Sequence, residues 1–452
     1  SEFQGGLKKT LTLSNAVAII VGSIVGAGIF VSPKGVTVQM YSFGGSMVMW
    51  LVSGLISMLG AMCFAELALL IPSSGGEYMY VYKACGPVAA FLRLWIEIII
   101  IRPSIVAVLS IVFANYVLVP IFPDCDSPAT AVRLLAAIAI STIAFINCVS
   151  VKASAMIQNV FTAGKILALL VIIGTGIVRI SMGQTANFEG PFEDTTLDPA
   201  NVALACIAGL FSFFGWNYLS TVTEELKNPK RDIPLSIIAS LIMIIIIYMM
   251  TIASYQTTVS TTEMINHNAI GVLFAERNYG FMWWILPLFV VMSVFGTVNG
   301  VIFTTARMTY VGGRCGHLPE VLNMVQDKLQ TPVTAVIFTA VVSMVYLTFD
   351  DIFALMTYLS FVQVLAFQLA IAILVYMRVK RPMKNPPVKF FLGVPIIFLL
   401  VTTVLDVFCI VGKPYECLGG VLMIFTGIPF YLFGVAWSKK PRSLQQKIDS
   451  IY

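Results

Sequence analysis

Twelve apolar runs of 17 to 35 residues divide the sequence, and each is long enough for a helix that crosses the hydrocarbon core of a bilayer, which takes ~20 residues (range ~17–25). Lipid offers no partners to backbone N–H and C=O groups, so a chain inside it must be helical or form a closed barrel. Only 11% of the residues are charged, which leaves little polar surface for a soluble fold. The sequence therefore predicts an all-α membrane protein with twelve transmembrane helices, at residues 13–38, 43–71, 86–120, 129–149, 153–182, 198–225, 233–256, 281–311, 332–348, 351–378, 390–411 and 417–437.

The loops between these runs differ in basic charge, and cytoplasmic loops are the ones enriched in Lys and Arg. With a cytoplasmic N-terminus, the outside loops contain few basic residues, chiefly Arg277 and Lys413. This alternation predicts that both termini are cytoplasmic. Residues 1–6, "SEFQGG", are interpreted as an expression remnant. The expected segments outside the spans are a cytoplasmic tail at 1–12, an extracellular loop at 183–197 and a cytoplasmic tail at 438–452.

Two of the runs are interrupted by glycine, at "IIVGSIVGAGIFVSP" (residues 19–33) and "AGLFSFFGWN" (residues 208–217). Each opens a group of five spans, at 13–182 and 198–378, which leaves two further helices in 379–437. Five is an odd number, so the second group must have inverted topology. Interrupted helices at matching places indicate a binding site near the middle of the membrane. The alternative is that the glycines only allow close helix packing.

A broken helix in a membrane is tolerated where its freed backbone groups bind a ligand. Half-helix N-termini present N–H donors and partial positive charge, which suit a carboxylate. Freed carbonyl groups suit an ammonium or another cation. An α-amino acid has both charged groups on one carbon, although any zwitterion would fit the same pattern.

Four longer motifs resemble one family: "IIVGSIVGAGIFVSPKGV", "CFAELALLIPSSGGEYMYVYKACGP", "GLFSFFGWNYLSTVTEELKNPKRDIPLSI" and "YVGGRCGHLP". The chain resembles the light chains of heteromeric, glycoprotein-associated amino acid transporters over roughly residues 8–443. These are the L-type and asc-like exchangers of the amino acid–polyamine–organocation superfamily. The resemblance implies a LeuT-like five-plus-five inverted repeat with discontinuous helices 1 and 6, sodium-independent exchange at the plasma membrane, and a single-span glycoprotein heavy chain as partner.

The resemblance also implies which residues bind the substrate. Residues of the first break would contact the carboxylate, and carbonyl groups of the second break would receive the ammonium. Phe211 resembles an aromatic gate, and "GWN" is typical of exchangers for neutral amino acids, whereas an acid at the Asn217 position marks cationic substrates. The substrate-binding set is Ser23, Ile24, Gly26, Ala27, Gly28, Phe211, Ser212, Phe214, Trp216 and Asn217. Two residues depart from the family: Phe214 is larger than the small residue of many L-type members, and Cys315 replaces an acid.

Lys165 lies deep in an apolar run, "FTAGKILALLVII", where an unpaired ammonium costs several kcal/mol. The resemblance places it near the first break, at the position of sodium in sodium-coupled relatives, so a fixed ammonium would replace that ion. Thr304 and Thr305 could line the same place. The alternatives are a lysine that snorkels to the headgroups and one that loses its proton, which would make transport proton-coupled.

Further charged or amide side chains lie in predicted spans. Glu97 and Arg102 are five positions apart, so they are not expected to share a helix face, and each is expected to pair with another helix. Gln363 stands where cystine-exporting relatives have an arginine, which argues against an anionic substrate. Glu66 is expected to face basic residues of an inner gate, among Lys227, Lys230, Arg231 and Arg314, or to belong to a solvated charge cluster; the same holds for Glu224 and Glu225.

Cys125 lies between two aspartates in "IFPDCDSPAT", a loop predicted to be outside, where disulfides persist. It could be an unpaired thiol, or bond to another outside cysteine such as Cys417. The resemblance implies a disulfide to the heavy chain. The eight cysteines show no CxxC and no metal-ligand spacing, so no metal or cofactor is expected.

The leading functional hypothesis is exchange of neutral L-amino acids by alternating access. A proton-coupled symporter of the same fold, or an exchanger that also accepts cationic amino acids, remains open. A channel would need rings of pore-lining charge. An enzyme would need clustered catalytic groups, yet the chain has only two histidines, His267 and His317, both in loops. A net charge of +5 gives no reason to expect nucleic acid.

Overall fold

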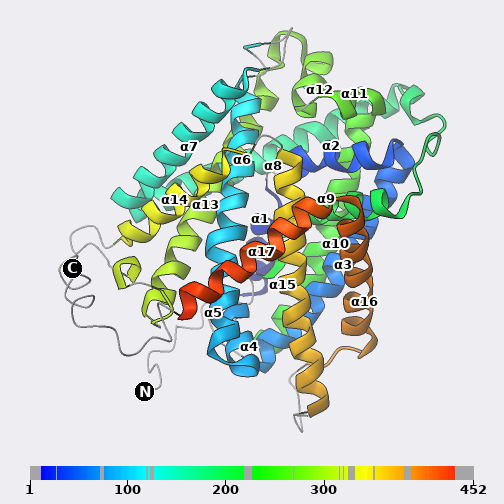
Figure 1. The fold of residues 1–452 in the computed structure, drawn as a ribbon. Helices are drawn as coiled ribbons and strands as arrows, with labels where there is room; N and C mark the ends of the chain where they lie inside the picture. The colour runs from blue at the N-terminus through cyan, green and yellow to red at the C-terminus, as the bar shows by residue number, and fades with distance from the viewer. Residues whose placement is uncertain are drawn as a thin grey trace.

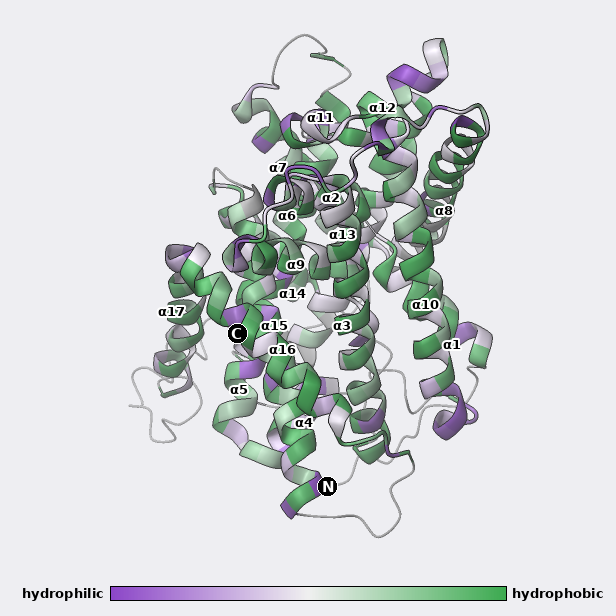
Figure 2. Cartoon of the chain, turned by 90° about the vertical axis from the view of Figure 1, so that its right-hand side faces the viewer, coloured by the Kyte–Doolittle hydropathy of each residue, from purple (hydrophilic) through white to green (hydrophobic). Residues whose placement is uncertain are grey.

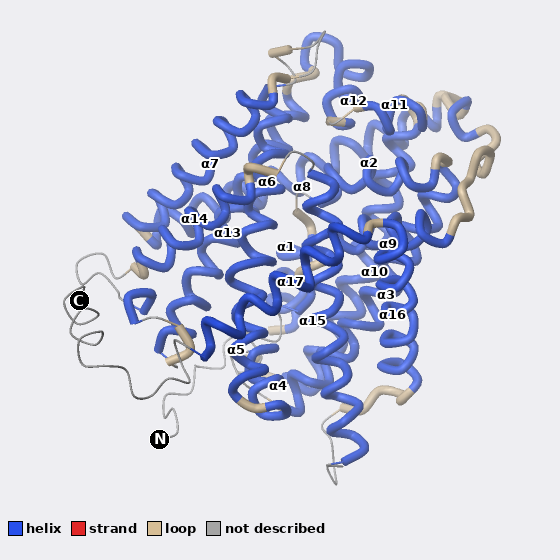
Figure 3. Tube along the Cα trace, in the orientation of Figure 1, coloured by secondary structure: helices blue, strands red, loops and turns tan. Residues whose placement is uncertain are grey.

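The computed structural model describes residues 12–26, 28–71, 76–118, 121–122, 127–217, 226–267, 269–314, 316–318, 320–323, 331–349, 352–380 and 388–432. In this part of the chain the secondary structure is helical, without a strand (Figure 3). The α-helices are α1 Leu13–Ile24, α2 Gly28–Met40, α3 Phe43–Leu70, α4 Gly76–Cys85, α5 Pro87–Trp95, α6 Arg102–Leu118, α7 Ala129–Val149, α8 Val151–Ser181, α9 Pro199–Phe213, α10 Pro229–Gln256, α11 Thr261–Asn266, α12 Ile270–Tyr279, α13 Ile285–Arg314, α14 Val333–Tyr346, α15 Ile352–Lys380, α16 Gly393–Gly412 and α17 Pro414–Tyr431. Shorter segments are the π-helix η1 Ile96–Ile101 and the 3-10 turns η2 Ala186–Phe188, η4 Gly280–Met282 and η5 Glu320–Asn323.

Eight helices of the described residues are long and apolar enough to cross a membrane, and the bent pair α1–α2 makes a ninth. Three shorter segments, α9, α14 and α17, occupy the places of the predicted spans 6, 9 and 12. Each predicted span therefore contains at least one helix. The long helices extend between one end marked by α4 and an opposite end marked by α11 and α12 (Figure 1). Their apolar residues lie along the sides, and hydrophilic residues gather towards the ends (Figure 2).

The first span breaks where its glycines predicted. α1 begins with a capping box between Thr12 and Asn15 and ends at Ile24, after which Val25 is extended, with φ −68° and ψ 98°. α2 begins at Gly28, and the two axes differ by 51°. Gly22 lies inside α1, so the helix tolerates one glycine and breaks at the next. Ala27 lies outside the described residues.

Contacts between helices repeat with a period of five spans. Spans 1 to 4 each pack on the span five places later: α2 on α9, α3 on α10, α6 on α13 and α7 on α14. The fifth spans cross over: α8 packs on α10 and α13, whereas α15 packs on α3 and α6. Exchanging the first five spans for the second five maps this contact pattern onto itself. This is the relation expected of two inverted repeats.

Loops predicted to share a side of the membrane lie together. Asn187, in the loop of residues 183–197, exchanges two hydrogen bonds with Gln256 at the end of α10, at 3.0 and 2.9 Å. Arg179 at the end of α8 donates to Asn278 of α12 at 2.7 Å. These contacts agree with the prediction that the loop of residues 183–197 and the connection from α10 to α12 lie on one side of the membrane.

The expectation for Glu66 was wrong. Its side chain is 1% exposed and pairs with Arg378 near the end of α15, whose Nε lies 2.7 Å from Oε1. The backbone N–H of Phe390 donates to the same carboxylate at 3.2 Å. A buried carboxylate needs a cation beside it to offset the cost of leaving water. Because α3 packs on α15, that cation is Arg378. Lys227, Lys230 and Arg231 are exposed; Glu224 and Glu225 lie outside the described residues, as does the side chain of Arg314.

Candidate functional site

The two broken helices touch at their breaks, and glycine makes this approach possible. A Cβ atom added to Gly28 would lie 2.7 Å from the Cα of Ser212 in α9. One added to Gly215, directly after α9, would lie 2.8 Å from the carbonyl oxygen of Ser23. Gly215 also has φ +124°, a conformation that side chains disfavour. The backbone of each break therefore lies against the other.

Tyr248 of α10 joins the two breaks. Its hydroxyl oxygen lies 3.1 Å from the carbonyl oxygen of Ile24 and 3.1 Å from that of Ser212. A phenol has one proton, so it donates to one of these carbonyls at a time. The ring is fully buried and packs against Trp50 and Phe213. The sequence analysis missed Tyr248, although a lone phenol in an apolar run signals a buried hydrogen-bond partner.

A cavity with about 630 Å³ of empty space, its opening included, lies beside this contact. Elements from both halves line it: the ends of α1, α2 and α9, with η1, α6, α13 and α15. Nine residues that the sequence analysis selected are brought together there. The lining consists of Ser23, Ile24, Gly28, Glu97, Ile105, Leu109, Phe211, Ser212, Phe214, Gly215, Asn217, Thr297, Val301, Gln363 and Phe367.

Two residues selected from the sequence lie just behind the cavity wall. Gly26 faces α13, where an added Cβ would lie 3.4 Å from the Thr297 hydroxyl. Trp216 is buried between Phe64 and Phe367, with ring centroids 4.9 and 4.5 Å away. Thr297 and Phe367 were missed, because nothing local in α13 or α15 marks the residue that faces a distant break.

A chain of buried polar and charged side chains connects two residues of the cavity wall, Asn217 and Glu97. The side-chain amide of Asn217 donates to Glu77 of α4 at 2.7 Å. Glu77 pairs with Arg93, whose Nη1 lies 2.7 Å from a carboxylate oxygen of Glu97. Glu97 receives Nε of Arg102 at 2.7 Å. Two carboxylates and two guanidinium groups alternate, so their formal charges cancel in a place where an unpaired charge would be costly.

Glu97 and Arg102 pair directly, which corrects the expectation that each needs a partner on another helix. The reason is the π-helix η1, in which the backbone N–H of Arg102 donates to the carbonyl of Glu97, five residues earlier. Residues five apart share a face in this geometry, whereas they do not in an α-helix. Nη1 of Arg102 also donates to Thr304 at 3.2 Å. Arg102 therefore holds Glu97 and α13, and it is absent from the cavity lining.

Lys165 lies near the middle of α8 with 3% exposure, in the segment that packs on α13. Its neighbour Gly164 faces Met292, where an added Cβ would lie 3.2 Å from the Met292 Cβ. A side chain so buried does not reach the headgroups, which disfavours snorkelling. Thr305 is buried and donates to Val301 of its own helix at 2.6 Å. Neither Lys165 nor the two threonines line the cavity, and their role in replacing sodium stays a prediction.

Three other expectations concern cysteines and metal. Cys125 and Cys315 lie outside the described residues. In the part of the chain that the structure describes, no group of three or more His, Cys, Asp or Glu side chains is arranged to hold a metal ion.

Comparison with known proteins fits this geometry. Residues 11–435 match a family described as amino acid permease. The "Large neutral amino acids transporter small subunit 2" of Rattus norvegicus is 40% identical over 454 residues, covering 98% of this chain and 84% of the relative. The "Asc-type amino acid transporter 1" of Mus musculus is 38% identical, with 98% and 84% covered. The "Cystine/glutamate transporter" of Homo sapiens is 39% identical, with 96% and 87% covered. The family match and these relatives agree, and the chain belongs to the amino acid permease family.

Proposed function

We propose that the protein exchanges neutral L-amino acids across the plasma membrane by alternating access, without sodium, as the light chain of a disulfide-linked heterodimer. The observation that carries the proposal is the cavity between the two breaks. The N-terminus of α2 offers N–H donors to a carboxylate, and the carbonyls of Ile24 and Ser212 beside Tyr248 offer acceptors to an ammonium. Backbone groups alone would therefore bind both the carboxylate and the ammonium of one amino acid.

The selectivity for neutral substrates rests on Asn217 and Gln363. The side-chain amide of Asn217 donates a hydrogen bond to Glu77, and the negative charge of Glu77 is balanced by a salt bridge to Arg93. Gln363 is 4% exposed and lines the cavity, and its Nε2 has no hydrogen-bond partner among the described residues. An amide there offers a neutral donor to the substrate. No uncompensated charge of the described lining would therefore attract a cationic or an anionic side chain.

The test is counterflow in liposomes reconstituted with the purified protein. Vesicles preloaded with leucine should take up labelled leucine faster than empty vesicles, with no response to sodium. Competition should be strong for leucine and alanine, and weak for lysine, glutamate and cystine. Uptake that ignores internal leucine would overturn exchange, and uptake that follows an imposed proton gradient would favour the symporter. Strong competition by lysine would favour an exchanger that accepts cations.

Gln363 provides a sharper test of the pocket. Gln363→Arg adds a fixed cation to the cavity wall, so competition by glutamate should rise relative to leucine. Gln368→Arg, on the same helix but beside Asp406, serves as the matched control, because Gln368 is absent from the lining. Equal selectivity in the two variants would show that Gln363 does not face the substrate.

A further inference from the structure

Two cysteines meet at the turn between α16 and α17, and the proposed exchange cycle uses neither. Cys409 lies in the last turn of α16, and Cys417 lies in the first turn of α17. Their Sγ atoms are 3.5 Å apart. The two residues are 0% and 1% exposed, so each thiol faces the other in a closed interior.

Both cysteines are connected to Lys413 by backbone hydrogen bonds. The N–H of Lys413 donates to the carbonyl of Cys409 at 2.8 Å, and the N–H of Cys417 donates to the carbonyl of Lys413 at 3.1 Å. The two helices also pack against each other beyond the turn. A disulfide needs its sulfur atoms about 2.05 Å apart. The two sulfur atoms are thus about 1.5 Å farther apart than in a disulfide, in van der Waals contact and without an intervening atom.

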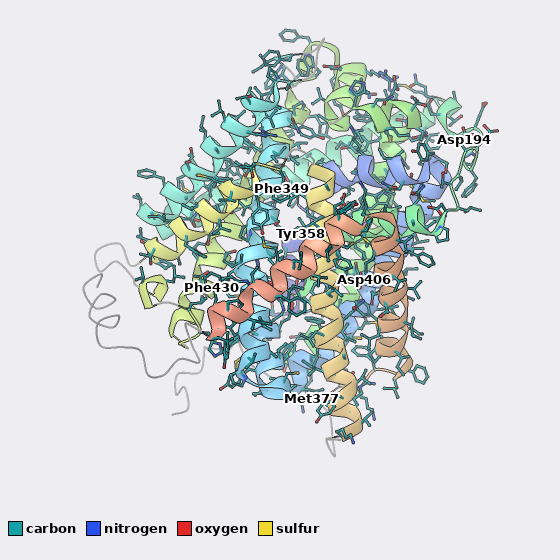
Figure 4. All side chains as sticks on the ribbon, viewed as in Figure 1. Asp194, Phe349, Tyr358, Met377, Asp406 and Phe430 are labelled. Atoms are coloured by element: carbon teal, nitrogen blue, oxygen red, sulfur yellow. The ribbon has the colours of Figure 1, made fainter. Side chains whose placement is uncertain are left out.

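This turn lies on the side of the molecule that holds the loop of residues 183–197. A Cβ added to Gly412 would lie 3.2 Å from Ala200 and 3.1 Å from Leu204, both in the first half of α9, which follows that loop. Figure 4 labels Asp406 on α16, one turn before Cys409, and Asp194 in the loop. The proposed topology puts this side outside, and the inference rests on that part of the proposed function. Outside segments pass through an oxidising compartment, where disulfides form and persist.

We propose that Cys409 and Cys417 form an intramolecular disulfide that joins the outer ends of α16 and α17. The oxidant is a disulfide-bearing oxidoreductase of the secretory pathway, acting before the hairpin is fully packed. One cysteine thiolate attacks a sulfur of the donor's disulfide, and a donor thiol leaves. The second cysteine, after losing its proton, attacks the mixed disulfide and releases the other donor thiol. Two protein thiols thus become one disulfide, while the donor disulfide becomes two thiols.

The pairing bears on the heavy chain as well. Cys417 is the other cysteine that sequence analysis placed near the outer face, and a bond to Cys409 removes it as a competitor for Cys125. The bridge to a partner would then depend on Cys125 alone. Cys63 in α3 and Cys206 in α9 serve as internal controls, since both are buried, each at 1% exposure. All four cysteines are free thiols in this structure, but only Cys409 and Cys417 have their sulfur atoms in contact among the described cysteines.

The sequence allows a direct test, because Glu416 stands directly before Cys417. Cells expressing the full chain are treated with N-ethylmaleimide before lysis and again in denaturant, without reductant. A glutamyl endoprotease then cuts after Glu416, between the two cysteines. The fragment that ends at Glu416 should stay joined to the fragment that begins at Cys417 until a reductant is added. Neither cysteine should carry the alkylating group before reduction, whereas Cys63 and Cys206 should carry it.

Full alkylation of Cys409 and Cys417 in never-reduced protein would overturn the inference. In Cys409→Ser, Cys417 should gain one alkylating group per chain; if it stays unmodified, it is bonded to a different cysteine and the proposed pair is wrong. The fragments report the bond whether or not the protein transports. A linked pair in a protein without counterflow would leave this inference standing and contradict the exchange function, and the opposite result would contradict the inference alone.

Discussion

At the scale of single residues, two aromatic side chains separate the cavity at the breaks from a neighbouring one. Phe214 and Phe367 line the first cavity and also a second, apolar cavity with about 230 Å³ of empty space. The second cavity extends to Trp216 and Phe398. The two rings are 5.8 Å apart between centroids and form the partition.

Phe214→Gly should therefore join the two cavities and widen acceptance towards bulky amino acids. The measurement is competition by tryptophan relative to alanine in counterflow. This ratio should rise by about tenfold, because the space left by the ring lets a bulky substrate bury additional apolar surface. Phe211→Ala is the matched variant, because Phe211 lines only the first cavity. It should slow exchange without that shift. An unchanged tryptophan-to-alanine ratio in Phe214→Gly would contradict the partition.

Lys165→Ala should lower the exchange rate by about tenfold or more, which corresponds to a loss of about 1.4 kcal/mol in the limiting step. The reason is the loss of a buried ammonium predicted to hold the first break in place of sodium. Surface labelling and detergent-extracted yield should stay close to wild type. Lys165→Arg keeps the charge and should retain more activity than Lys165→Ala. Wild-type exchange in the alanine variant would end the hypothesis.

At the scale of elements, α1 and the end of α9 can meet only because glycine stands at their contact, whereas Gly22 inside α1 has open space around it. A Cβ atom added to Gly22 would meet no atom within 4 Å, whereas one added to Gly215 would meet the Ser23 carbonyl at 2.8 Å, at a residue with positive φ. The contact also explains why α9 ends at Phe213, since the chain must turn to let the breaks meet.

Gly215→Ala should be strongly damaging, because it adds a clash to backbone strain of about 1–3 kcal/mol. The expected result is a large loss of correctly folded protein or of exchange, measured by size-exclusion yield and by counterflow. Gly22→Ala is the control: it removes a helix-interior glycine in open space, and should be neutral or stabilising by up to about 1 kcal/mol. Similar effects of the two substitutions would show that the breaks do not meet at Gly215.

At the scale of the whole molecule, the predicted outer loop with Cys125 is where a partner would be attached. A bridge between two proteins that also touch through their helices raises their effective concentration without creating the contact. Cys125→Ser should therefore abolish the reducible heterodimer band on a non-reducing gel, while part of the surface expression and transport remains. Cys85→Ser is the control, since Cys85 is an exposed free thiol at the opposite end, by the predicted topology. A band that survives in Cys125→Ser places the bridge elsewhere.

The sequence by itself predicted the spans, the break between α1 and α2 and the end of α9 at the second glycine motif; the alternation of sides stays a prediction. Hydrophobic length and glycine content act locally, so each can be recognised within a window of about 20 residues. The same local logic, helped by the family motifs, selected Ser23, Ile24, Gly28, Ser212 and Asn217, which meet in one cavity.

Only the tertiary structure decided which polar groups satisfy one another. Tyr248 reaches Ile24 across 224 positions of sequence, and Arg378 reaches Glu66 across 312. The pairing of Glu97 with Arg102 depends on a π-helix, which no local residue pattern predicts. In a medium without water, a buried charge or hydroxyl depends on a partner that packing brings within about 3 Å. That choice is a property of how distant helices pack, and it is not written in the local pattern of any one of them.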